Sequence, residues 1–128
     1  MSYFFSKRVT TSYEQAIAEV TARLKEKGFG VLTEIDVKAT LKQKLDVDFR
    51  PYKILGACNP QYANRALHLE NHIGLMLPCN VVVQQLPDGG VEVSAIDPVA
   101  SMQAIDNPGL TEVAASVRGL LAEIVAAL

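Results

Sequence analysis

The chain has 128 residues, of which 49% are hydrophobic and 20% charged, and its net charge is −2 at pH 7. This length and composition predict a single domain over residues 1–128 with one hydrophobic core, and they exclude a wholly disordered chain. The first 15 residues lack the apolar stretch of a secretory signal, and no apolar run is long enough to span a bilayer. A cytoplasmic protein without membrane contact is therefore expected.

The charges are unevenly distributed along the chain. Residues 1–65 carry 11 basic and 7 acidic side chains, whereas residues 66–128 carry 1 basic and 7 acidic side chains. The two halves thus have net charges of +4 and −6, an asymmetry that can favour two-fold or head-to-tail association of copies. Because the basic residues form no stripe, binding of nucleic acid through its phosphates is not expected.

Hydrophobic periodicity and turn residues predict strands that alternate with helices, followed by a hairpin and a final helix. The expected elements are a strand at 2–10, a helix at 13–27, a strand at 29–35, a short helix after Asp36, a strand at 52–58, a helix from Asn59 to residue 73, strands at 80–86 and 91–96, and a helix at 110–127.

Local signals define several of these boundaries. Ser12 and Gln15 have the spacing of a capping box at the start of the first helix. Asn59-Pro60 pairs an N-cap residue with proline at the first helical position. The turn at 87–90, PDGG, favours a hairpin. The short helix after Asp36 has a narrow apolar stripe and three lysines, which are interpreted as a solvated face.

Four motifs stand out: YKILGACNP at 52–60, AL at 66–67, IGLMLPCNV at 73–81 and AIDP at 95–98. In these motifs the chain resembles, over nearly its whole length, the prokaryotic family catalogued as domain of unknown function 302. The resemblance implies an α+β fold of β-α-β(4)-α order, with a curved antiparallel sheet, helices on one face and two short inserted helices. It also implies a homodimer, and a topology like one half of the TATA-box-binding protein saddle.

The resemblance supplies no established activity, and a shared topology carries no inference about DNA binding. The familiar catalytic signatures are missing as well, since the sequence contains no phosphate-binding loop, dinucleotide fingerprint, nucleophile elbow or zinc-protease motif. Neither a catalytic residue nor a cofactor is therefore assigned.

Both cysteines and both histidines lie between residues 58 and 79. The spacing of His68 and His72 suits zinc ligands one helical turn apart. A helical wheel, however, turns both histidines away from the apolar face, towards solvent or a partner. A zinc site that combines both histidines with Cys58 and Cys79 is therefore not expected.

The two cysteines are better candidates for chemistry. If strands 52–58 and 80–86 are antiparallel neighbours, as the family topology implies, Cys58 and Cys79 could come within the distance of a disulfide. Cys58 also precedes a helix N-terminus, which favours a thiolate. Three interpretations remain open: buried structural thiols, a functional redox or metal-binding pair, and a lone nucleophile.

On the same wheel Glu70 falls inside the apolar sector. Its carboxylate is expected either to bind a backbone donor or a basic side chain as a structural clamp, or to have a raised pKa in a pocket. The leading hypothesis is a dimeric module that binds a small ligand or partner in a pocket. The candidate residues are Cys58, Cys79, Glu70, Asn59 and Asn80. A thiol-dependent redox or metal-binding protein and a structural oligomerisation domain are the alternatives.

Overall fold

Five strands form one antiparallel sheet in the computed structural model, which describes residues 2–128. The strands lie in the order β1-β5-β4-β3-β2, and every neighbouring pair is antiparallel. The elements are β1 (Phe4–Val9), α1 (Tyr13–Glu26), β2 (Gly30–Asp36), α2 (Val37–Leu45), β3 (Tyr52–Cys58), α3 (Pro60–Leu69), the 3₁₀ helix η1 (Ile73–Met76), β4 (Cys79–Gln85), β5 (Val91–Ile96), α4 (Pro98–Ser101) and α5 (Pro108–Ala126). This order confirms the predicted α+β fold.

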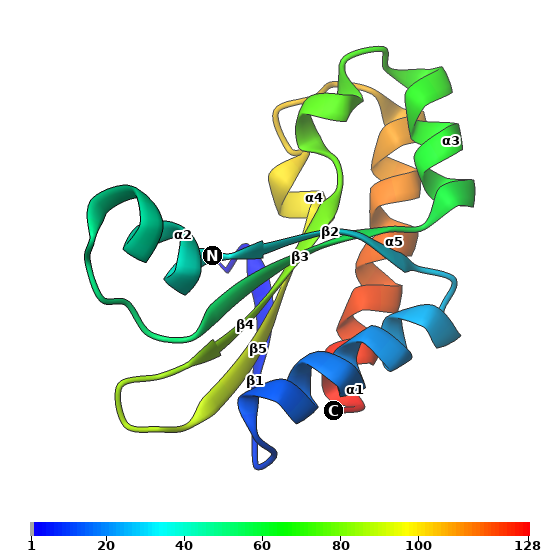
Figure 1. Cartoon of the computed structure of the whole chain (residues 1–128). Helices are drawn as coiled ribbons and strands as arrows, with labels where there is room; N and C mark the ends of the chain where they lie inside the picture. Colours follow the sequence, from blue (N-terminus) through cyan, green and yellow to red (C-terminus); the bar gives the residue numbers. More distant parts are fainter. Residues whose placement is uncertain (1) are drawn as a thin grey trace.

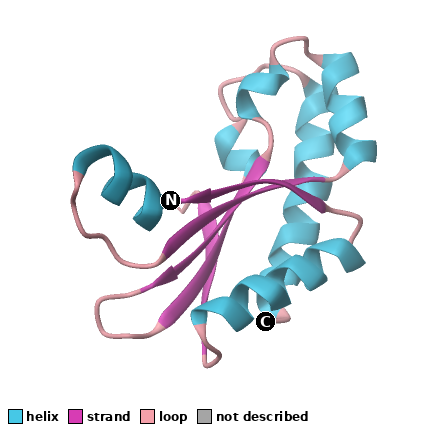
Figure 2. Ribbon diagram, viewed as in Figure 1, coloured by secondary structure: helices cyan, strands magenta, loops and turns pink. Residues whose placement is uncertain are grey.

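The long helices cover one face of the sheet. Figure 1 shows α1, α3 and α5 on that side and α2 on the other, and Figure 2 shows the strands as one curved layer between them. Side chains alternate along each strand, so every second residue enters the core beneath the helices. The fully buried core side chains include Leu55, Val81, Val83 and Val93 from the strands and Val20, Leu24, Leu121 and Ile124 from the helices.

Side-chain caps fix the starts of the first two helices as predicted. The Ser12 hydroxyl accepts from the Gln15 backbone N–H at 3.1 Å, and the Gln15 side chain accepts from the Ser12 N–H at 3.2 Å. Asp36 accepts from the Ala39 N–H at 2.9 Å and so begins α2. No helix within residues 2–128 has the length and apolar character needed to span a membrane.

The helix predicted from Asn59 to residue 73 is shorter than expected. α3 ends at Leu69, and Glu70 follows in extended conformation. Ile73, the last residue of the predicted apolar pattern, is buried as expected. It belongs, however, to η1 and not to α3. A distant side chain stabilises this end, since Asn107 Nδ2 donates to the Leu69 carbonyl at 3.0 Å. The boundary therefore depends on a contact between residues 38 positions apart.

One buried acidic residue joins the sheet to the last helix. Asp97 is 8% exposed and follows β5 directly. Its carboxylate accepts from the Val99 N–H at 2.9 Å, which caps α4, and from Arg118 Nε of α5 at 3.0 Å. The Arg118 guanidinium also lies 5.1 Å from the centre of the Phe5 ring. Asp97 thus connects three elements at the end of the hairpin.

Candidate functional site

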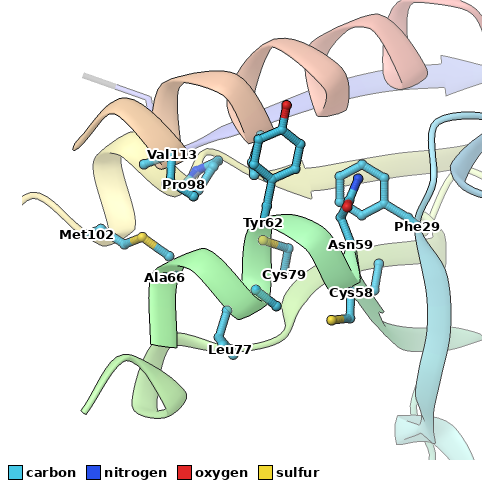
Figure 3. A pocket seen from close by; sticks show the side chains of 14 residues that line it. Phe29, Cys58, Asn59, Tyr62, Ala66, Leu77, Cys79, Pro98, Met102 and Val113 are labelled. Carbon is cyan, nitrogen blue, oxygen red and sulfur yellow. The ribbon is translucent and has the colours of Figure 1, made fainter. Parts of the chain in front are cut away.

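The two cysteines lie at the ends of adjacent antiparallel strands, as predicted. Cys58 ends β3, Cys79 begins β4, and Ala57 is the direct cross-strand partner of Cys79. Both are free thiols. Figure 3 shows that their sulfur atoms do not point at one another. The two residues are therefore neighbours that are not joined by a disulfide.

A small apolar cavity lies next to both cysteines, between α3, α5 and the sheet (Figure 3). Its free volume is about 30 Å³, which is room for one or two water molecules and not for a metabolite. The lining residues are Phe29, Ala57, Cys58, Asn59, Tyr62, Ala63, Ala66, Leu77, Cys79, Pro98, Met102, Val113, Ala114 and Val117.

The surroundings of Cys79 disfavour a reactive thiolate. Cys79 is 9% exposed, and burial, together with the nearby Cys58, raises the pKa of its thiol from 9.0 to about 11. At neutral pH the group is therefore a neutral thiol, which is neither a good nucleophile nor a ready metal ligand. Cys58 is half-buried beside it.

Asn59 lines the same cavity but does not cap α3 with its side chain. Its Nδ2 instead donates to the Lys27 carbonyl oxygen at 3.2 Å. This bond joins the start of α3 to the end of α1. Asn59 therefore holds two helices together beside the thiols.

Glu70 does not lie in the apolar sector of a helix, because α3 ends one residue before it. Its carboxylate accepts from the His72 backbone N–H at 3.0 Å, and His72 Nδ1 lies 3.4 Å away. The backbone bond from His72 is the main reason that the pKa of Glu70 lies below its ordinary value. Of the two predicted roles, the structure shows the backbone clamp, and the raised pKa in a pocket is wrong.

Both histidines are exposed as predicted, but the helical wheel applies only to His68, because α3 ends before His72. His68 Nδ1 lies 2.8 Å from the Asn64 carbonyl oxygen of its own helix, and the His72 side chain is 83% exposed. Within residues 2–128, no group of three or more histidine, cysteine, aspartate or glutamate side chains is arranged to hold a metal ion.

Asn80 lies apart from the other candidates, on the sheet face that α1, α3 and α5 leave uncovered. It is exposed, whereas its neighbours Cys79 and Val81 point into the core. We call this side the open face, although α2 packs against its β2 and β3 end. A shallow groove of about 270 Å³ crosses it, lined by Tyr3, Phe4, Tyr52, Asn80, Val82, Gln84, Glu92, Ser94, Ala95 and Ile96.

Cross-strand pairing gives the open face two short apolar rows, with Ser94 beside the first and Asn80 beside the second. Val82 of β4 pairs with Ile54 of β3, and Ile54 pairs with Ile35 of β2. Next to this row, Phe4 of β1 pairs with Ile96 of β5. Ile35 and Phe4, at the outer ends of these rows, are 49% and 40% exposed.

One arginine fixes the border of the groove. Arg50 Nε donates to the Gln84 side chain at 2.9 Å, and its guanidinium lies 4.4 Å from the Phe49 ring centre and 5.5 Å from that of Tyr52. Such cation–π contacts restrict an otherwise mobile side chain. Of the residues that line this groove, only Asn80 was identified from the sequence. The strict alternation of residues 91–96 was the available signal, because it indicates that one face of this strand is not buried in the core.

Comparisons with known proteins agree with the fold. A family model described as "Domain of unknown function DUF302" matches residues 5–128. The structure is similar to the "uncharacterized conserved protein DUF302 from Bacillus stearothermophilus", with a TM-score of 0.91, 32% sequence identity and 98% of each chain covered. No curated protein matches the sequence. These comparisons identify the family and support the fold, but they assign no activity.

Proposed function

Because the chain belongs to the DUF302 family, whose description names no activity, we propose a function from its own geometry. We infer that it is a binding module, that the open face is its binding surface, and that a second copy of the chain binds there. The single observation that carries the proposal is the amount of surface the chain leaves exposed.

The accessible surface of the chain is 7549 Å². A monomeric protein of 13.9 kDa exposes about 6,700 Å² according to the usual scaling with mass. The excess is about 900 Å², which is close to the roughly 800 Å² that each partner buries in an interface of standard size. One uncovered interface would account for this excess.

The open face has the composition of such an interface. Its centre is the apolar row of Val82, Ile54 and Ile35, and the groove beside it carries aromatic and amide side chains at its border. Apolar centres with polar rims and aromatic residues are typical of protein–protein contacts. Because antiparallel sheets tolerate water on one face, the same surface stays soluble before it is covered.

The cysteine cavity is the weaker candidate for binding. It has a free volume of only about 30 Å³, and the pKa of Cys79 is raised to about 11, which disfavours redox and metal chemistry at neutral pH. The groove is about nine times larger by the same measure of volume. The geometry thus favours the open face over the thiols.

Light scattering across micromolar concentrations tests the proposal. The wild-type chain should have twice the mass of 13.9 kDa, and Val82→Lys should reduce the mass to that of one chain, because it places a charge at the apolar centre. Ile35→Lys is a second variant at an exposed position, and Leu75→Lys is the matched control, since Leu75 is 84% exposed on η1.

Retained far-UV circular dichroism would show that the variants fold. A wild-type chain that remains at one chain mass would refute the proposal. In that case, melting shifts caused by small aromatic ligands, and their loss in Val82→Lys, would instead assign the groove to a small molecule.

A further inference from the structure

Given the dimer proposed above, on which this inference depends, we propose that helix α2 of each copy packs into the open-face groove of the other. The contact is reciprocal, and each copy contributes the same helix and the same groove. Three observations carry it: the exposure of α2, its position on the face, and its charge.

None of the nine residues of α2 is buried. Val37 and Leu41 are half-buried where α2 packs on β2 and β3, whereas Leu45 is 66% exposed, so the apolar stripe is covered at its start and uncovered at its end. A helix this short is marginal in water unless an apolar face packs against something. The C-terminal end of α2, with Leu45, is therefore the part of the stripe that is free to contact a partner.

The helix and the groove lie on different halves of the same side of the sheet. α2 contacts β2 and β3, at one end of the strand order, and lies on the side opposite α1 and α5 (Figure 1). The groove lies mainly over β1, β5 and β4, towards the other end. Helix α2 and the groove therefore lie towards opposite edges of the sheet.

This separation makes the face self-complementary. When two open faces meet around a two-fold axis parallel to the strands, the strand order of one copy runs opposite to that of the other. The β2 end of each copy then lies over the β1 end of its partner, and each α2 meets the partner's groove. Both grooves are filled, so the contact closes at two copies and leaves no site for a third.

The lysines of α2 and Glu92 of the groove have opposite charges. The charged residues of α2 are Lys38, Lys42 and Lys44, and Glu92 is the charged side chain among the described residues that line the groove. Within residues 2–128, Lys42 is paired with acidic side chains, but Lys38 and Lys44 are not.

Two basic side chains lie near Glu92, and neither forms an ion pair with it among the described residues. Arg50 donates instead to Gln84, which is paired with Glu92 across the sheet. Arg8 is the cross-strand partner of Glu92 on β1, but the Arg8 guanidinium is held by Asp88 at 2.7 Å. The Glu92 carboxylate accepts only a long bond of 3.3 Å from Ser94 among the described residues. Glu92 is therefore available to a lysine from the partner's α2.

Complementary charge reversal tests the contact. Glu92→Lys alone and the double variant Lys38→Glu/Lys44→Glu alone should each raise the dimer dissociation constant at least about tenfold at low salt, because each creates like charges across the contact. An equimolar mixture of the two variants should form a dimer again, now with one chain of each kind. Glu112→Lys, an exposed position on α5, is the matched control and should dimerise as the wild type does.

Sedimentation velocity distinguishes the outcomes. If the wild type is a dimer and both reversed variants dimerise unchanged, the α2 contact is wrong while the proposed function stands. If neither variant dimerises, and the mixture also stays monomeric, the charges are not opposed as inferred. A wild-type monomer would instead refute the proposed function itself.

Discussion

Replacing Cys79 with alanine is expected to remove a loss of stability that the wild-type chain should show above pH 9. The pKa of the Cys79 thiol is raised to about 11 in the folded chain by burial, whereas the ordinary value is 9.0. Between these values the unfolded chain has released the proton and the folded chain still holds it. Ionisation therefore favours unfolding in that range.

The magnitude follows from the size of the shift. A difference of one pKa unit corresponds to about 1.4 kcal/mol, so the free energy of unfolding should fall by roughly 2–3 kcal/mol between pH 9 and pH 11 because of this thiol. Below pH 9 the thiol is protonated in both the folded and the unfolded chain, so it does not make the free energy of unfolding depend on pH. Loss of the buried sulfur in Cys79→Ala costs about 1 kcal/mol at every pH and does not alter the slope.

Urea unfolding followed by circular dichroism at pH 8, 9, 10 and 11 measures the effect. The difference between the wild type and Cys79→Ala cancels the other groups that titrate in this range, including Tyr13, whose pKa is also raised by burial. The wild type should lose its advantage over the variant as the pH rises to 11. A difference that stays constant across the four pH values would show that Cys79 ionises as readily in the folded chain as in the unfolded one.

Two further predictions concern packing. Gly56→Ala should destabilise the fold by about 1–3 kcal/mol in urea unfolding, because an added Cβ would meet the Thr33 side chain and the Pro78 ring. Adding Thr33→Ala to this variant should recover part of the loss. Full stability of Gly56→Ala would contradict this packing. Asp97→Ala should lower the free energy of unfolding by about 2–4 kcal/mol, because it removes the cap of α4 and leaves Arg118 without its carboxylate. Asp97→Asn should lower it less, because the amide oxygen can still accept the capping bond. Equal losses in the two variants would show that the cap is unimportant.

The strands and most helix starts could be predicted from local signals in the sequence. Ser12 and Asp36 cap helices through bonds to residues three positions away, and the predicted strand at 52–58 matches β3. These features depend on neighbours in the chain, so a sequence pattern contains them. The antiparallel pairing of strands 52–58 and 80–86 was implied by the family resemblance, and β3 and β4 are paired in this way.

The end of α3 could not be predicted in this way. The apolar pattern extends to Ile73, but the backbone is already extended at Glu70, where Asn107 from a distant part of the chain donates to the Leu69 carbonyl. The position of Glu70 depends on this boundary, and for that reason the wheel placed its carboxylate in an apolar sector. A contact between distant parts of the chain thus decided the role of a candidate site residue.

The open face also lay beyond sequence reasoning. Alternation in β5 shows that the strand has two unlike faces, but it does not show which helices cover them. The placement of α2 on the side opposite α1, α3 and α5 depends on how the chain leaves β2 in three dimensions (Figure 1). The groove and the exposed helix stripe therefore emerged only from the structure.

The most direct test of the central claim is a zero-length cross-link between two copies. Equal amounts of unlabelled and ¹⁵N-labelled chain are mixed, treated with a carbodiimide and digested for mass spectrometry. We expect a peptide that joins Lys38 or Lys44 of one chain to Glu92 of a chain with the other label. Cross-links of these residues found only within chains of one label, at concentrations where the protein is dimeric, would contradict the account.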